Sequence, residues 1–233
     1  MELISVDIET SNVFDLKPGE DLEKYAPFHI AVAATASSTG EPKVWMSLDS
    51  RGQPCTNMTR ETARELLNHL RSLQQQGHRL CAWNGASFDL RWIGFAAEDL
   101  LTAREVALDL YDPMLQFFNR KGFPVGLDAV AQGMDPQLKK LLKSEDAPRL
   151  WCEGRHEKVI EYVCSDATIT VKLVERIEQT RCVRWVTRKG DVRSERLGEL
   201  LTVRQVLAEP EPDQSWMDSP IRRVKFVAWM GRS

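Results

Sequence analysis

The chain has 233 residues, 42% of them hydrophobic and 28% charged, which fits one sizeable domain with at most a small appendage. It opens without a basic, apolar leader, and the uncharged stretch over residues 27–40 is too short to cross a membrane. We therefore expect a cytoplasmic protein without a membrane partner. The net charge of the chain is −3, whereas residues 181–233 carry a net charge of +4. This local positive charge is compatible with a nucleic-acid contact but is too small to require one.

The first 83 residues predict most of a sheet and one long helix. Alternating apolar residues predict strands over residues 3–9, 28–36, 43–48 and 78–83, the first three as an antiparallel meander. Apolar residues at helical spacing predict a helix over residues 59–76, which Gly77 ends.

The middle of the chain is mostly helical. We expect a helix from Asp89 through Ile93, a short strand over residues 106–108, and a helix that begins at Asp112. Short helices follow over residues 126–133 and 136–143, and a long one over residues 155–181. This order predicts an α/β fold with a central mixed sheet flanked by helices.

Residues 182–233 differ in sequence pattern from the helical region before them. We expect them to form a small C-terminal appendage of unknown role, after a main domain of residues 1–181. Residues 182–187 and 192–197 predict a hairpin, residues 200–208 a helix, and residues 209–213 a stiff acidic link. The aromatic residues of the tail indicate that it docks on the body: Trp216, Phe226 and Trp229.

Two acids alternate with apolar residues on the first strand. Side chains of a strand repeat every second residue, so Asp7 and Glu9 leave from the same face. Two carboxylates at close range repel, and a hard divalent cation such as Mg²⁺ relieves that repulsion. The pair therefore indicates half of a metal site, although an exposed Asp-x-Glu is commonly only solvated.

Further acids lie at the start of one predicted helix and inside another. Asp89 opens a helix, where the helix dipole favours a carboxylate. Asp166 lies four residues after Tyr162, so the phenol and the carboxylate share a helix face. Taken one at a time, these residues are better explained as a helix-terminal acid and as a packed tyrosine with an incidental aspartate.

Together, three motifs in order resemble the DEDDy branch of the DEDD 3′–5′ exonuclease superfamily over about residues 3–181. They are Asp7-x-Glu9, Asn84-x-x-x-Phe88-Asp89 and Tyr162-x-x-x-Asp166.

The resemblance implies a ribonuclease H-like fold and two divalent cations, Mg²⁺ or Mn²⁺. It implies that Asp7, Glu9, Asp89 and Asp166 hold the cations, with Asp7 as the bridging ligand, and that Tyr162 orients the attacking water. The other branch of the superfamily carries His five residues before the last Asp. That position is Glu161 here and His156 is ten residues away, so the tyrosine branch fits better.

Residues beside these motifs are also candidates for contacts with the substrate. Thr10 is similar to a position that contacts the terminal nucleotide, and a strand-end cap is its alternative. Asn84 either donates to the substrate or braces its turn, and Trp83 either stacks on a base or packs in the core. Residues 139–143 carry a basic helical face, Lys139, Lys140 and Lys143, that is either solvated or guides phosphates.

The stretch from Trp83 to Leu90 looks closer to the proofreading domains of family B DNA polymerases than to ribonuclease D-type enzymes. We therefore expect a metal-dependent 3′–5′ exonuclease that hydrolyses phosphodiester bonds at single-stranded 3′ ends of DNA by a two-metal mechanism. Two alternatives stay open: an exoribonuclease that trims RNA 3′ ends, and a catalytically silent nucleic-acid-binding module on the same fold.

Overall fold

The computed structural model describes residues 1–17, 20–135, 137–138 and 145–231. A four-stranded sheet in the order β3-β2-β1-β4 forms its centre. β1 (Leu3–Thr10), β2 (Ile30–Ser37) and β3 (Lys43–Trp45) run antiparallel in turn, while β4 (Arg79–Cys81) pairs in parallel with the first half of β1. The predicted meander and the strand that returns to the sheet are both confirmed.

The two faces of β1 have different neighbours because its side chains alternate. Ile4, Val6 and Ile8 join the larger hydrophobic core, which also holds the buried residues of α1 (Arg60–Gln75). That helix buries Ala63, Leu66, Leu67 and Leu70, whereas Leu73, at the same spacing, is partly exposed. Its buried stripe therefore belongs to the same core as the apolar face of β1.

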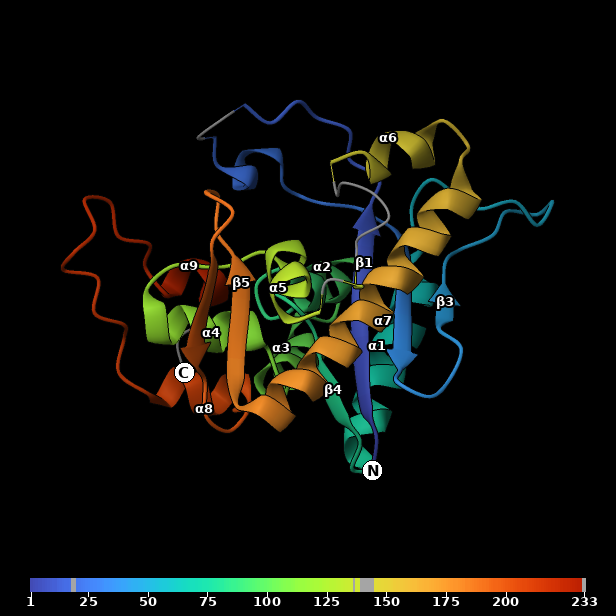
Figure 1. The fold of residues 1–233 in the computed structure, drawn as a ribbon. Helices are drawn as coiled ribbons and strands as arrows, with labels where there is room; N and C mark the ends of the chain where they lie inside the picture. The colour runs from blue at the N-terminus through green and yellow to red at the C-terminus, as the bar shows by residue number, and fades with distance from the viewer. Residues whose placement is uncertain (18–19, 136, 139–144, 232–233) are drawn as a thin grey trace.

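The opposite face of the sheet lies under α7 (His156–Thr180), which Figure 1 shows crossing in front of β1 and β2. Val159 and Val163 of α7 pack there with Val32 and Ala34 of β2. Helices thus cover both faces of a mixed sheet, as the predicted α/β fold requires, and the long helix expected over residues 155–181 is confirmed.

Between β4 and α7 the described chain is helical. The helices are α2 (Asp89–Ala96), α3 (Leu100–Leu108), α4 (Pro113–Lys121), α5 (Leu127–Met134) and α6 (Ala147–Cys152). α6 was not predicted, and the helix expected over residues 136–143 falls mostly outside the described residues.

The strand predicted over residues 106–108 is wrong, because these residues form the last turn of α3. Asp99 caps that helix by accepting a hydrogen bond from the backbone N–H of Thr102 at 3.0 Å. Val106, Ala107 and Leu108 are all buried, and a short buried apolar run does not distinguish a strand from a turn of helix.

The C-terminal segment packs on the same core as the rest of the chain. β5 (Cys182–Val186) and β6 (Val192–Arg196) form the predicted hairpin, followed by α8 (Val203–Ala208) and α9 (Val224–Val227). A Cβ atom on Gly133 of α5 would lie 2.6 Å from the backbone of Trp185, so the hairpin and α5 are in backbone contact. Phe226 is buried in the main core, which confirms that the tail docks.

Candidate metal centre

β1 carries the first two acids at its carboxyl end. Asp7 pairs with Ala34 and Glu9 with Val32 on β2, and the register shifts between Glu9 and Thr10. Irregular pairing of this kind re-aims side chains and is frequent beside functional sites. Glu9 is buried, whereas Asp7 is partly exposed to solvent.

α7 brings the third acid, Asp166, which is 2% exposed. The next residue along the helix, Ala167, accepts a hydrogen bond from the Ser5 hydroxyl at 2.6 Å through its carbonyl oxygen. This contact joins residues 162 positions apart and holds α7 against the strand that carries Asp7. Sequence reasoning missed Ser5, although alternation places it on the same strand face as Asp7.

Three of the four predicted acids come together. One carboxylate oxygen from each of Asp7, Glu9 and Asp166 lies within 4.8 Å of the other two. Three carboxylates at this spacing repel one another, and a divalent cation with a preference for oxygen ligands offsets that repulsion. The donor set therefore fits Mg²⁺ or Mn²⁺.

Among the described residues, the group of three carboxylates does not include Asp89, the fourth acid. Asp89 nevertheless contacts the same strand. Its Oδ1 accepts a hydrogen bond from the backbone N–H of Ile8 at 3.0 Å. β4 pairs with β1 only as far as Ser5, so the carboxylate takes up a backbone donor beyond the end of that pairing. Asp89 is thereby held next to the residues that flank Ile8.

An irregular turn delivers Asp89 to this position. Asn84 has a φ of 68°, a left-handed conformation that Asn adopts more readily than most residues. Its carbonyl oxygen accepts hydrogen bonds from the N–H groups of Ser87 at 3.1 Å and Phe88 at 3.0 Å. A Cβ atom on Gly85 would lie 2.3 Å from that of Ala82, so the turn admits no side chain there. These contacts favour the bracing role among the two that we expected for Asn84.

Asp112 fixes the turn from the N-terminus of α4. Its carboxylate accepts hydrogen bonds from the N–H groups of Asn84 at 3.1 Å, Ala86 at 3.0 Å and Leu115 at 3.2 Å. Burial raises the pKa of Asp112 to about 6 against the opposing effect of these donors. Sequence reasoning identified Asp112 only as a helix start, because its contact with a turn 26 residues earlier leaves no local signal.

Tyr162 is fully buried, one helical turn before Asp166. Its ring belongs to the cluster between α7, α6 and β2, together with Val159 and Trp151. The helix therefore places the phenol and the carboxylate on one face, as the spacing predicted.

The remaining predicted substrate residues are also well covered. Thr10, the last residue of β1, is 8% exposed. Trp83 is 8% exposed and donates its indole N–H to the carbonyl oxygen of Val125 at 2.9 Å. This contact uses the polar atom of Trp83 inside the protein. The basic face predicted at Lys139, Lys140 and Lys143 lies outside the described residues.

Comparisons with known proteins add no relative. The chain matches no protein-family model, and no curated protein matches its sequence. Within the described residues, none of the helices combines the length and the apolar character that a membrane crossing needs.

Proposed function

We propose that this protein is a metal-dependent 3′–5′ exonuclease that acts on single-stranded 3′ ends of DNA, on a ribonuclease H-like fold. One observation carries the proposal: Asp7, Glu9 and Asp166 converge within 4.8 Å from a strand and a helix that are remote in sequence. Asp89 accepts a hydrogen bond from Ile8 of the same strand, and we assign it as the fourth carboxylate.

Hydrolysis of a phosphodiester adds negative charge to a group that is already anionic, so the site must supply positive charge. Two divalent cations, when bound, would activate the attacking water and stabilise the leaving oxygen. Asp7, Glu9, Asp89 and Asp166 would hold them. The clustered acids support this function, because a bound cation would offset the repulsion among them.

The chain's own residues would place the water and the substrate. Tyr162, one turn from Asp166, would orient the attacking water through its hydroxyl. We assign Asn84 to bracing the turn. Thr10 lies beside the acids at the end of β1, and we assign it to the terminal nucleotide. We keep Trp83 in that assignment only for its ring, because its N–H is bound to Val125.

Two other functions are distinguished by experiment. An exoribonuclease on the same fold would use the same acids, since the difference lies in how the site treats the 2′-hydroxyl. A silent nucleic-acid-binding module would keep the fold without cleavage. We prefer DNA because the stretch from Trp83 to Leu90 resembles polymerase proofreading domains.

The test uses 5′-labelled oligonucleotides: single-stranded DNA, 3′-recessed duplex DNA and single-stranded RNA, each with Mg²⁺, Mn²⁺ or EDTA. We expect a ladder of shortened, still labelled DNA with either cation and intact DNA in EDTA. Release of the label as a mononucleotide would show the opposite polarity. Shortening of RNA alone would favour the exoribonuclease, and tight binding without shortening would favour the binding module.

Asp7→Ala gives the matched mutational test. Loss of one ligand should lower the cleavage rate by about 10²–10³-fold or more, judged by the loss of one electrostatic stabiliser in other enzymes. Thermal unfolding in EDTA should occur at the same or a higher temperature, because one repelling charge is gone. Asp15→Ala, which removes an exposed carboxylate, is the control. Full activity of purified Asp7→Ala protein would contradict the proposal.

A further inference from the structure

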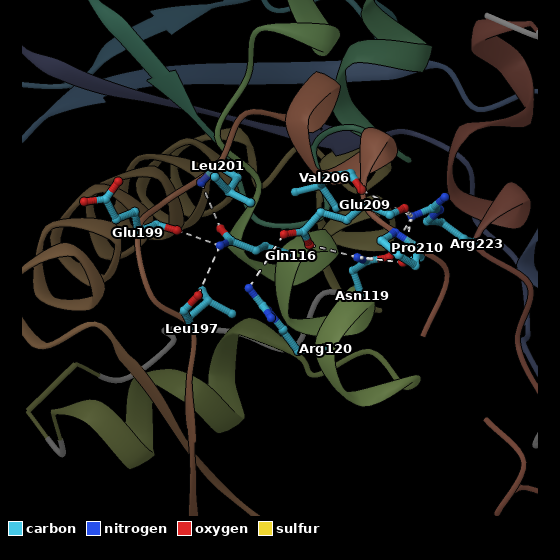
Figure 2. A network of polar contacts seen from close by, with 10 residues as sticks. All are labelled: Gln116, Asn119, Arg120, Leu197, Glu199, Leu201, Val206, Glu209, Pro210 and Arg223. Carbon is cyan, nitrogen blue, oxygen red and sulfur yellow. Dashed lines mark hydrogen bonds and ion pairs between the residues drawn. The ribbon is translucent and has the colours of Figure 1, made fainter. Parts of the chain in front are cut away.

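α4 contains buried polar side chains whose hydrogen bonds go to the C-terminal segment (Figure 2). Gln116, 1% exposed, donates to the carbonyl oxygen of Glu199 at 2.7 Å and accepts from the N–H of Leu201 at 3.1 Å. Asn119, 6% exposed, donates to the carboxylate of Glu209 at 3.1 Å. Buried polar groups that lose such partners are costly, so α4 and this segment need each other.

Arg223 closes the same network from the far end of the segment (Figure 2). Its Nη1 donates to Asn119 Oδ1 and to the carbonyl oxygen of Glu209, both at 2.8 Å. Three residues later, the centroid of the Phe226 ring lies 4.6 Å from the centroid of the Phe118 ring on α4. The segment therefore reaches α9 already fixed to α4 by both polar and apolar contacts.

From this anchor, Trp229 reaches the turn that carries Asp89. Its indole N–H donates to the carbonyl oxygen of Ala86 at 2.8 Å. The N–H of the same Ala86 donates to Asp112 at 3.0 Å. Both polar groups of one residue, three positions before Asp89, are thus held by side chains from α4 and from the C-terminal segment.

We propose that Trp229 is a positioning residue for Asp89, and that the C-terminal segment buttresses the metal centre through it. A catalytic carboxylate tolerates little displacement, because a shift of about 1 Å in a reacting group can cost about 10²-fold in rate. Asp112 binds N–H groups of the turn, whereas Trp229 binds a carbonyl oxygen of it. Trp229 therefore restricts a movement of the turn that the hydrogen bonds to Asp112 do not restrict.

The test is Trp229→Phe, which keeps an aromatic ring and removes the donor. Trp216→Phe is the matched control, because Trp216 is 62% exposed and donates within its own segment, to the carbonyl oxygen of Asp213 at 3.2 Å. Hydrogen exchange under native conditions follows the amides of Ser87 and Phe88. We expect them to exchange about tenfold faster in Trp229→Phe and unchanged in Trp216→Phe.

The kinetic part of the inference rests on the proposed function. On single-stranded DNA, Trp229→Phe should lower kcat by about tenfold and leave KM within twofold, because the turn moves a metal ligand rather than a substrate contact. A stability loss without a local effect would leave kcat of the folded protein unchanged. If wild-type protein cleaves nothing, the proposed function fails, and the exchange experiment still decides the role of Trp229.

Unchanged exchange at Ser87 and Phe88 in folded Trp229→Phe would overturn the inference. If that variant does not fold, the wild-type protein supplies the second measurement. Its Trp229 indole N–H should exchange at least about tenfold more slowly than that of Trp216, because only the former is bonded to a turn inside the body. Equal rates for the two indoles would overturn the inference as well.

Discussion

The two sides of the candidate metal centre bring their acids to β1 by different means. Asp166 lies in the middle of a 25-residue helix whose position is set by many packed side chains. Asp89 follows a turn that contains a left-handed residue, Asn84. A few hydrogen bonds hold this turn, which donates to Asp112 and accepts from Trp229. Packing distributes the free energy of holding α7 over many contacts, whereas the turn depends on a few polar atoms.

This difference predicts unequal sensitivity to single substitutions. Removing one polar group from the α7 side should change stability modestly, because the surrounding packing remains. Removing one polar group from the turn side should leave buried backbone donors unsatisfied and free the turn to move.

Asp112→Asn should have the largest effect on stability. The amide replaces one acceptor oxygen with a donor that faces the N–H of Ala86, and leaving buried donors unsatisfied costs about 1–3 kcal/mol. Urea denaturation measures the free energy of unfolding. Asp99→Asn is the control, because Asp99 also caps a helix and Asn is an equally good cap. Equal losses for both variants would remove the special role of the turn.

The same variant tests the pH dependence. Burial raises the pKa of Asp112 in the folded protein to about 6, above the unfolded value of about 3.9. The folded state therefore holds the proton more tightly, and the stability from this group is present at pH 4 and is lost as the pH rises through 6. Relative to Asp112→Asn, wild-type protein should lose unfolding free energy between pH 4 and pH 7. A gain over that range would contradict the raised pKa.

Tyr162→Phe tests the α7 side at the level of chemistry. It removes only a hydroxyl from a fully buried ring, so the helix should stay in place. We expect cleavage to slow by about tenfold because the water is less well oriented, while Mn²⁺ affinity measured by titration stays within twofold of wild type. An unchanged cleavage rate would exclude Tyr162 from the mechanism and leave it a core residue.

Ser5→Ala should have the smallest effect. It removes the hydroxyl that donates to the carbonyl oxygen of Ala167, at a cost of about 1 kcal/mol in unfolding free energy. Ser194→Ala, at an exposed position of β6, is the control. A loss as large as that of Asp112→Asn would mean that a single contact, rather than packing, positions α7.

The sequence predicted what depends on local periodicity. Alternation placed Asp7 and Glu9 on one face, and helical spacing placed Tyr162 and Asp166 on another. It did not predict what depends on distant partners. Asp112 and Trp229 act on Ala86 over 26 and 143 residues of chain, and no spacing rule connects such positions. The last turn of α3 was mistaken for a strand because its three buried residues carry no period of their own.

The contact between Ser5 and Ala167 joins residues 162 positions apart in the chain. A growing chain that has not yet reached Asp166 lacks one of the three gathered carboxylates, however well its sheet has formed. If the three acids hold a cation as we propose, tight binding requires this long loop to be closed. Under the same proposal, metal affinity would report whether a preparation of this protein is completely folded.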